Sequence, residues 1–241
     1  MTPQLRETIQ QKLLEASMKI LKDYTNSALL INSCHLAMER YGDKSRPVHL
    51  STTGNIPLPL RLNMEIEEEL FNDELVDRYS SETQNLIYEQ YVSNSVSVID
   101  GVFEDIYEEL LKEFDPNLSE KQINDKIRAA WSQNSLIEYF IQNTGIQDST
   151  NPQKRIKEAF DRYKEYRIIR HALMHNKGVL SDKHIRQLDE IHDDADIDSK
   201  EKTMKNSPFY ESRKVLLNIN IFLSFRKFLY ELTGYFIQAL E

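Results

Sequence analysis

The chain has 241 residues, with 30 Lys and Arg against 39 Asp and Glu, a formal net charge of −9 and 40% hydrophobic residues. This composition is that of a globular protein with one sizeable core, and it excludes a chain that is globally disordered, collagen-like or of low complexity. The single cysteine, Cys34, excludes an internal disulfide and a thiolate zinc cluster, and no run approaches the roughly 18 apolar residues of a membrane span. We therefore expect a cytoplasmic protein with no membrane segment.

The first part of the chain has the pattern of a long helix. Apolar residues recur at intervals of three and four from Leu5 to Leu29, which is the spacing of one helix face. This helix either continues to Tyr41 or breaks near Asn26 and Ser27.

The segment from 48 to 60 departs from helical spacing. Apolar and polar residues alternate on both sides of residues 53–55, which predicts a small β-hairpin arm. Pro57 and Pro59 lack the N–H that a strand ladder uses, so they restrict this arm to an edge. An acidic helical stretch is expected from 62 to 79.

The strongest helical pattern lies between residues 82 and 114, where one stripe of the predicted helix is apolar. Ser81 and Gln84 have the spacing of a capping box at its start. Ser119 and Gln122 repeat that spacing ahead of one or two further helices.

Three more helical segments complete the predicted fold. The first begins after Pro152 and ends at residues 176–178, where Asn and Gly are typical stop signals. A short amphipathic segment at 185–191 and a closing helix at 215–240 follow. We predict an all-α fold with long antiparallel helices, arranged as a single helical domain over 1–241.

Bases gather in one region of this acidic chain. Between Asn151 and Arg186 there are ten Lys and Arg but only four Asp and Glu. The overall acidity argues against a sequence-independent DNA binder, which needs many cations along the backbone. The basic segment is either a local surface that faces phosphate or a solvated helix face.

The candidate functional residues lie within this basic segment. His171 and His175 fall one turn apart on one face of the predicted helix, and Arg167 extends the row by another turn. Zinc sites also use this histidine spacing, but the metalloprotease pattern needs Glu after the first His and Ala172 stands there. We therefore predict no metal site. The alternative is that these polar groups merely cap the helix end near Asn176.

The segment Arg170-His-Ala-Leu-Met-His175 resembles the Arg-x4-6-His motif of the HEPN superfamily of small all-α proteins, many of which are metal-independent endoribonucleases. The polar residue that often follows the Arg in that family is His171 here. The resemblance covers a HEPN-like core at 82–240 and leaves 1–80 as N-terminal helices with the hairpin arm.

One position departs from a form of the motif that is found in toxins. Those toxins have a Tyr two residues after the His and are silenced by nucleotidylation of it, whereas Lys177 stands here. Silencing by nucleotidylation of that Tyr is therefore not expected for this chain.

The resemblance implies a homodimeric endoribonuclease that acts as a toxin or an antiviral defence effector, without metal or cofactor, on an RNA substrate and with an antitoxin or regulatory protein as a further partner. It implies catalytic roles for Arg170, His175 and His171, and RNA-binding roles for Arg167, Lys177 and Asn176.

This chemistry fits the residue types. RNA supplies its own nucleophile, the 2′-OH, so cleavage needs a base, an acid and a cation for the charge on phosphorus. Arg170 and His175 lie about 140° apart around a straight helix, so one helix presents them poorly to one phosphate. In the family, two subunits bring their motifs together across a cleft, and an isologous contact would do so here.

A second function remains open. The chain could be a catalytically silent helical module that binds RNA or a protein partner and keeps a vestigial motif. Retention of both Arg170 and His175 favours the enzyme, whereas the acidic net charge favours the silent module.

Overall fold

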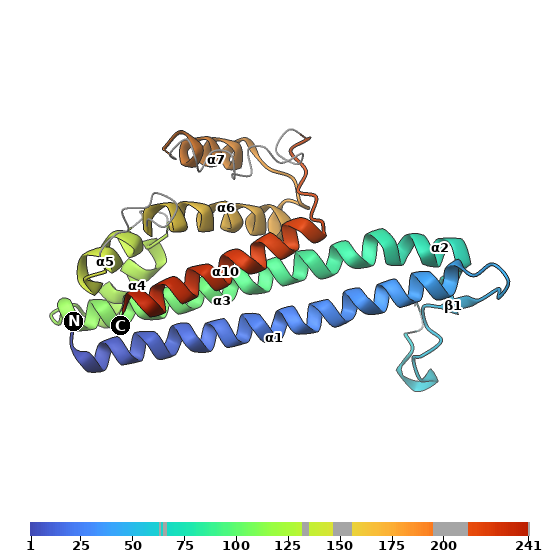
Figure 1. Ribbon diagram of the computed structural model, residues 1–241, viewed down its shortest axis with the longest axis horizontal. Helices are drawn as coiled ribbons and strands as arrows, with labels where there is room; N and C mark the ends of the chain where they lie inside the picture. Colours follow the sequence, from blue (N-terminus) through green and yellow to red (C-terminus); the bar gives the residue numbers. More distant parts are fainter. Residues whose placement is uncertain (63, 65–66, 132–134, 147–155, 195–211, 241) are drawn as a thin grey trace. The chain divides into compact units, whose positions relative to one another are not determined.

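The computed structural model describes residues 1–62, 64, 67–131, 135–146, 156–194 and 212–240, and these are mostly helical (Figure 1). The chain divides into two compact units, Met1–Tyr24 with Glu89–Glu241 and Thr25–Tyr88. The all-α prediction is confirmed. The α-helices are α1 (Pro3–Gly42), α2 (Asn72–Asp77), α3 (Thr83–Phe114), α4 (Glu120–Ala129), α5 (Ser135–Thr144), α6 (Ile156–His175), α7 (Asp182–Asp194) and α10 (Ile219–Ala239).

Long antiparallel helices form the first unit, as the sequence predicts. Lys12 near the start of α1 lies 3.8 Å from both Asp105 and Glu109 near the end of α3. Further along α1, the ring of Tyr24 contacts the ring of Tyr91, which comes earlier in α3. Because the contacts run in opposite directions along the two helices, α1 and α3 are antiparallel.

Helix α6 is antiparallel to α10. The ring of Phe160 packs on Phe236, and the ring of Tyr166 packs on Phe225 and Phe228. An early residue of α6 thus meets a late residue of α10, and the reverse.

The core of this unit is aromatic. The rings of Phe103, Phe140, Phe160 and Phe236 all lie within 6.4 Å of one another and are fully buried. They come from α3, α5, α6 and α10, so the cluster joins four helices. Burial of such rings is the main term that holds the helices together.

Of two predicted helix starts, one lies within the described residues and one does not. Ser119 caps α4, and its hydroxyl accepts from the backbone N–H of Gln122 while the Gln122 side chain reaches back. The capping box predicted there is confirmed. Pro152, the predicted start of α6, lies outside the described residues, and α6 is described from Ile156.

The second unit contains the predicted hairpin, with a different second strand. Strand β1 (His49–Ser51) pairs antiparallel with β2 (Glu69–Phe71), with Leu50 opposite Leu70. The residues expected to form the second strand include a 3-10 helix, η1 (Leu58–Leu60). The prolines there supply no N–H for a ladder, whereas Pro57 has the backbone angle that begins such a turn.

Of the two alternatives for the first helix the structure has the unbroken one, since α1 continues through Asn26 and Ser27. Two other helix predictions in this unit are corrected. Ser81 does not cap α3, because a π-helical turn, η2 (Arg78–Glu82), joins α2 to α3 and the Ser81 hydroxyl donates to the carbonyl of Asp77 at 2.7 Å. Within the stretch expected to be a helix from 62 to 79, residues 63, 65 and 66 lie outside the described residues, Glu69–Phe71 form strand β2, and helix α2 begins at Asn72.

Among the described residues, none of the helices combines the length and the hydrophobicity that crossing a bilayer requires.

Candidate functional site

Helix α6 has a buried side and an exposed end. Phe160, Tyr163 and Ile169 are buried. His171 and His175, in the last turn and a half of the helix, are exposed. The same helix therefore contributes to the core along most of its length and presents polar side chains to solvent where it ends.

The end of α6 is built by a left-handed pair of residues. Lys177 has φ of 53° and Gly178 has φ of 74°, and the N–H of Gly178 donates to the carbonyl of Ala172 at 2.9 Å. This is how helices commonly stop, and glycine adopts such a φ at little cost. The predicted stop is confirmed, and it leaves Lys177 exposed directly after the histidine row.

Two further backbone bonds fix this turn. The carbonyl of Asn176 accepts from Val179, and the carbonyl of Gly178 accepts from Val215, which lies before α10, at 2.8 Å. The predicted RNA-binding residues Asn176 and Lys177 are therefore held in a defined turn beside His175.

Three histidines meet at this end of α6. The ring centroids of His171 and His175 are 4.8 Å apart. His171 Nδ1 also lies 3.0 Å from Nε2 of His184, which is in α7 and only 4% exposed. The structure thus brings His171 and His175 together, as their spacing predicts, and adds a third imidazole.

The environment of His171 and His184 favours their neutral forms. The pKa of His171 is lowered by desolvation and by the nearby charges of His175, Lys183 and Arg170. The pKa of His184 is lowered by burial and by His171 and Lys183. Both imidazoles are therefore uncharged near neutral pH, so each has one ring nitrogen that donates a hydrogen bond and one that accepts.

Arg170 lies toward the buried side of the helix. Its side chain is partly buried, and its Nε is covered and has no hydrogen-bond partner among the described residues. It is close enough to Tyr163 for its charge to oppose the rise in that phenol's pKa that burial causes. An unpaired guanidinium N–H is costly unless a ligand or another chain completes it.

Arg167 does not join the histidine row as a free cation. Its Nε donates to Asp100 Oδ1 at 2.7 Å, and its guanidinium lies 4.1 Å from the centre of the Trp131 ring. Tyr163 donates to the same carboxylate oxygen at 2.8 Å. Arg167 thus holds α6 to α3, and an RNA-binding role for it would have to use what remains exposed, 28% of the side chain.

His184 was not identified from the sequence. The sequence does contain a signal for the start of its helix, since Ser181 and His184 have the spacing of a helix N-cap and the third residue of the helix. The structure forms this cap: the His184 N–H donates to Ser181 Oγ at 3.3 Å, and Nδ1 of His184 accepts from the Ser181 N–H at 3.2 Å. That α7 folds back onto α6 could not be read from the spacing.

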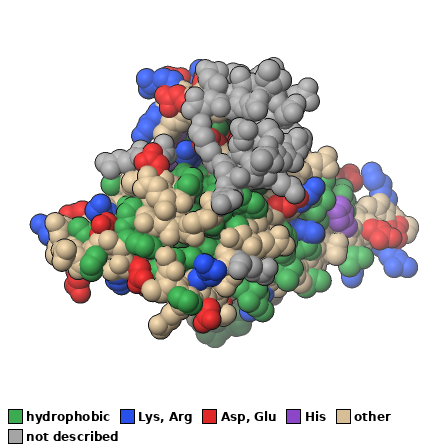
Figure 2. Space-filling model, turned by 60° about the vertical axis from the view of Figure 1, so that its left-hand side comes forward, with side chains coloured by type: hydrophobic (Ala, Val, Ile, Leu, Met, Phe, Trp, Pro, Cys, Tyr) green, Lys and Arg blue, Asp and Glu red, His purple; other side chains and the backbone are tan. Residues whose placement is uncertain are grey.

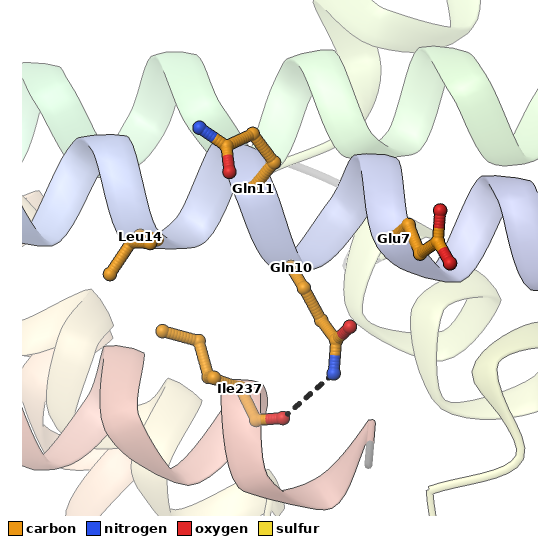
Figure 3. Close-up of a pocket in the computed structure, with 5 residues that line it drawn as sticks. All are labelled: Glu7, Gln10, Gln11, Leu14 and Ile237. Atoms are coloured by element: carbon orange, nitrogen blue, oxygen red, sulfur yellow. Dashed lines mark hydrogen bonds between the residues drawn. The ribbon is translucent and has the colours of Figure 1, made fainter.

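Outside the histidine cluster, the described residues form a hollow and no metal-binding group. No group of three or more His, Cys, Asp or Glu in the described ranges could hold a metal ion. A shallow hollow lies between α1 and α10, where the Gln10 amide donates to the carbonyl of Ile237 at 3.4 Å (Figure 3). It is lined by none of the candidate residues: its lining is Glu7, Gln10, Gln11, Leu14 and Ile237.

Charge on the visible surface is mixed. On the face shown in Figure 2, Lys and Arg side chains are interspersed with Asp and Glu. Close to His171, the Lys and Arg side chains whose charges act on its imidazole are Lys183 and Arg170.

Comparison of this chain with protein-family models, with curated proteins and with solved structures found no match.

Proposed function

We propose that the protein is a metal-independent endoribonuclease of the HEPN type. One observation carries the proposal: the imidazoles of His171 and His175 lie in contact at the exposed end of α6, directly after Arg170. Two imidazoles and a guanidinium, once brought together at one phosphate, can cleave RNA through its own 2′-OH.

In the proposed reaction the 2′-oxygen attacks phosphorus, a 2′,3′-cyclic phosphate forms, and the bond from phosphorus to the 5′-oxygen breaks. The proton of the 2′-OH goes to a base, and the 5′-oxygen takes a proton from an acid. His175 serves as one of these groups, and Arg170 stabilises the charge on the phosphoryl oxygens. His171, neutral and in contact with His175, orients the phosphate.

A homodimer supplies the remaining geometry. Within one chain, Arg170 lies toward Tyr163 and the covered side of α6, whereas His175 is exposed. Five residues apart, the two positions lie about 140° apart around a straight helix, so a single protomer presents them poorly to one phosphate. A two-fold contact at the end of α6 would bring both copies of each residue together.

A role as a toxin or defence effector in the cytoplasm belongs to the same proposal. It rests on the resemblance of the segment from Arg170 to His175 to the family motif.

The runner-up is a silent module that binds RNA or a protein. The engagement of Arg167 with Asp100 and Trp131 favours its protein-binding form, because one of the expected RNA-binding cations is already paired.

Cleavage assays separate the two functions. The purified full chain should cut mixed RNA in EDTA and leave 2′,3′-cyclic phosphate ends, and it should not cut DNA or 2′-O-methyl RNA. Products with a 5′-phosphate and a 3′-hydroxyl, or loss of activity on chelation, would overturn the mechanism. RNA binding without any cleavage would favour the silent module. His35→Ala, which changes an exposed histidine in α1, is the control.

A further inference from the structure

His184 makes two hydrogen bonds that together define where its proton lies. The backbone N–H of Ser181 points at Nδ1 of His184, at 3.2 Å. A nitrogen that accepts a hydrogen bond carries no proton, so a neutral His184 must carry its proton on Nε2.

The second bond passes this constraint to His171. Nε2 of His184 lies 3.0 Å from Nδ1 of His171. Because His184 Nε2 carries the proton, it donates and His171 Nδ1 accepts. A neutral His171 must then carry its own proton on Nε2.

We infer that His184 is a positioning residue, which fixes the ring and the tautomer of His171 so that its Nε2–H is available as a donor beside His175. Its part in cleavage rests on the proposed function, in which that donor binds a phosphoryl oxygen. The Ser181 backbone N–H thus fixes the proton of His184 on Nε2, and His184 in turn fixes the proton of His171 on Nε2.

The placement of His184 suits this role. It is 4% exposed, so water does not compete for its two bonds. The charged and titratable groups near the pair are Arg170 and His175 on α6 and Lys183 on α7. Each is a base or a cation, so each opposes a second proton on the pair and keeps the donor and acceptor roles fixed.

The tautomer can be measured without any RNA. Two-bond ¹H–¹⁵N correlation spectra of the full chain labelled at histidine, taken at about pH 8 where imidazoles are neutral, should show both His171 and His184 with the proton on Nε2. His184→Gln places an amide donor near the same point and should keep the His171 tautomer. His184→Leu removes the donor and should give His171 a mixture of tautomers.

Opposite results overturn the inference. A proton on Nδ1 of His171 in the unmodified chain would reverse the assigned direction of the bond. An unchanged His171 spectrum in His184→Leu would show that His184 does not position it. Should His184→Leu fail to fold, the spectra of the unmodified chain and of His184→Gln still decide. His35→Gln is the matched control.

Cleavage rates add a separate test. If the chain cuts RNA, His184→Leu should slow cleavage by about 10-fold, less than the roughly 10²-fold loss of a proton-transfer group, and should change its pH profile, whereas His184→Gln should restore both. If the unmodified chain and its variants all fail to cut, the proposed function fails while the spectra still decide the role of His184. An unchanged rate and profile in His184→Leu would overturn the catalytic part of the inference.

Discussion

The middle and the end of α6 use the same kinds of polar residue in opposite ways. In the middle, the single O–H of Tyr163 is shared between the carbonyl of Val96 at 2.9 Å and Asp100, and Arg167 pairs with the same carboxylate. At the end, His171 and His175 contact each other and remain exposed, and His171 is hydrogen-bonded to His184 of α7.

This contrast separates structure from chemistry along one helix. A polar group whose hydrogen bonds are completed by a neighbouring helix stabilises the fold, because breaking the bonds leaves a partner unpaired. A polar group that is exposed and only oriented by its neighbours contributes little to stability and is available to a ligand. The same substitution should therefore have different effects at the two places.

The largest expected effect is on catalysis at the end of the helix. His175→Ala should lower the cleavage rate by roughly 10²-fold or more, the scale of a lost proton-transfer group, and Arg170→Ala should do the same through lost charge stabilisation. The melting temperature of His175→Ala should move by less than about 2 °C, because the side chain is exposed. A fall of several degrees with unchanged cleavage would make His175 a structural residue.

The next effect is on stability in the middle of the helix. Asp100→Ala removes the acceptor of the Arg167 Nε–H and leaves Tyr163 only the carbonyl of Val96, so it should lower the free energy of unfolding by about 2 kcal/mol. Asp105→Ala, also in α3, is the control. Asp105 is 63% exposed in a 3.8 Å ion pair with Lys12, so its loss should cost under about 0.5 kcal/mol. Equal losses in urea unfolding would contradict the contrast.

The turn that ends α6 gives a third test. Gly178→Ala forces a side chain into φ of 74° and should cost about 1 kcal/mol. Gly101→Ala, in α3, is the matched change, since nothing lies within 4 Å of the added carbon and alanine favours a helix by about 1 kcal/mol. The two variants should change stability in opposite directions, and a stabilising Gly178→Ala would contradict the described turn.

Features that depend on neighbouring residues in the sequence could be predicted. The apolar spacing of 82–114 and the capping box at Ser119 give α3 and the start of α4 almost to the residue. The row of His171 and His175 follows from a separation of one helical turn.

Features that depend on residues far apart in the sequence could not be predicted from it. The partner of β1 is β2 at 69–71 rather than the adjacent segment, because the prolines at 57 and 59 prevent pairing there. Asp100, the partner of Arg167, is 67 positions away. The sequence around Arg167 contains no signal for such a distant contact, so its pairing with Asp100 could not be predicted beside the RNA-binding role expected of it.

The smallest expected effect is the pH dependence of stability at the histidine cluster. The pKa values of His171 and His184 are lowered in the folded protein, so below about pH 6.5 the unfolded chain takes up protons that the folded chain does not. This contribution to stability is complete above that pH and is lost as the pH falls through the lowered values. Glu89 and Glu104, whose pKa values burial raises, contribute a dependence of stability on pH with the opposite sign.

The test is therefore the difference between the unmodified chain and His184→Gln in urea unfolding from about pH 7.5 to 5.5. The variant should lose less stability over this range, with His35→Gln as the control. A variant that loses as much as the unmodified chain would mean that folding does not hold His184 neutral, and the end of α6 would then lose its distinction from an ordinary solvated helix end.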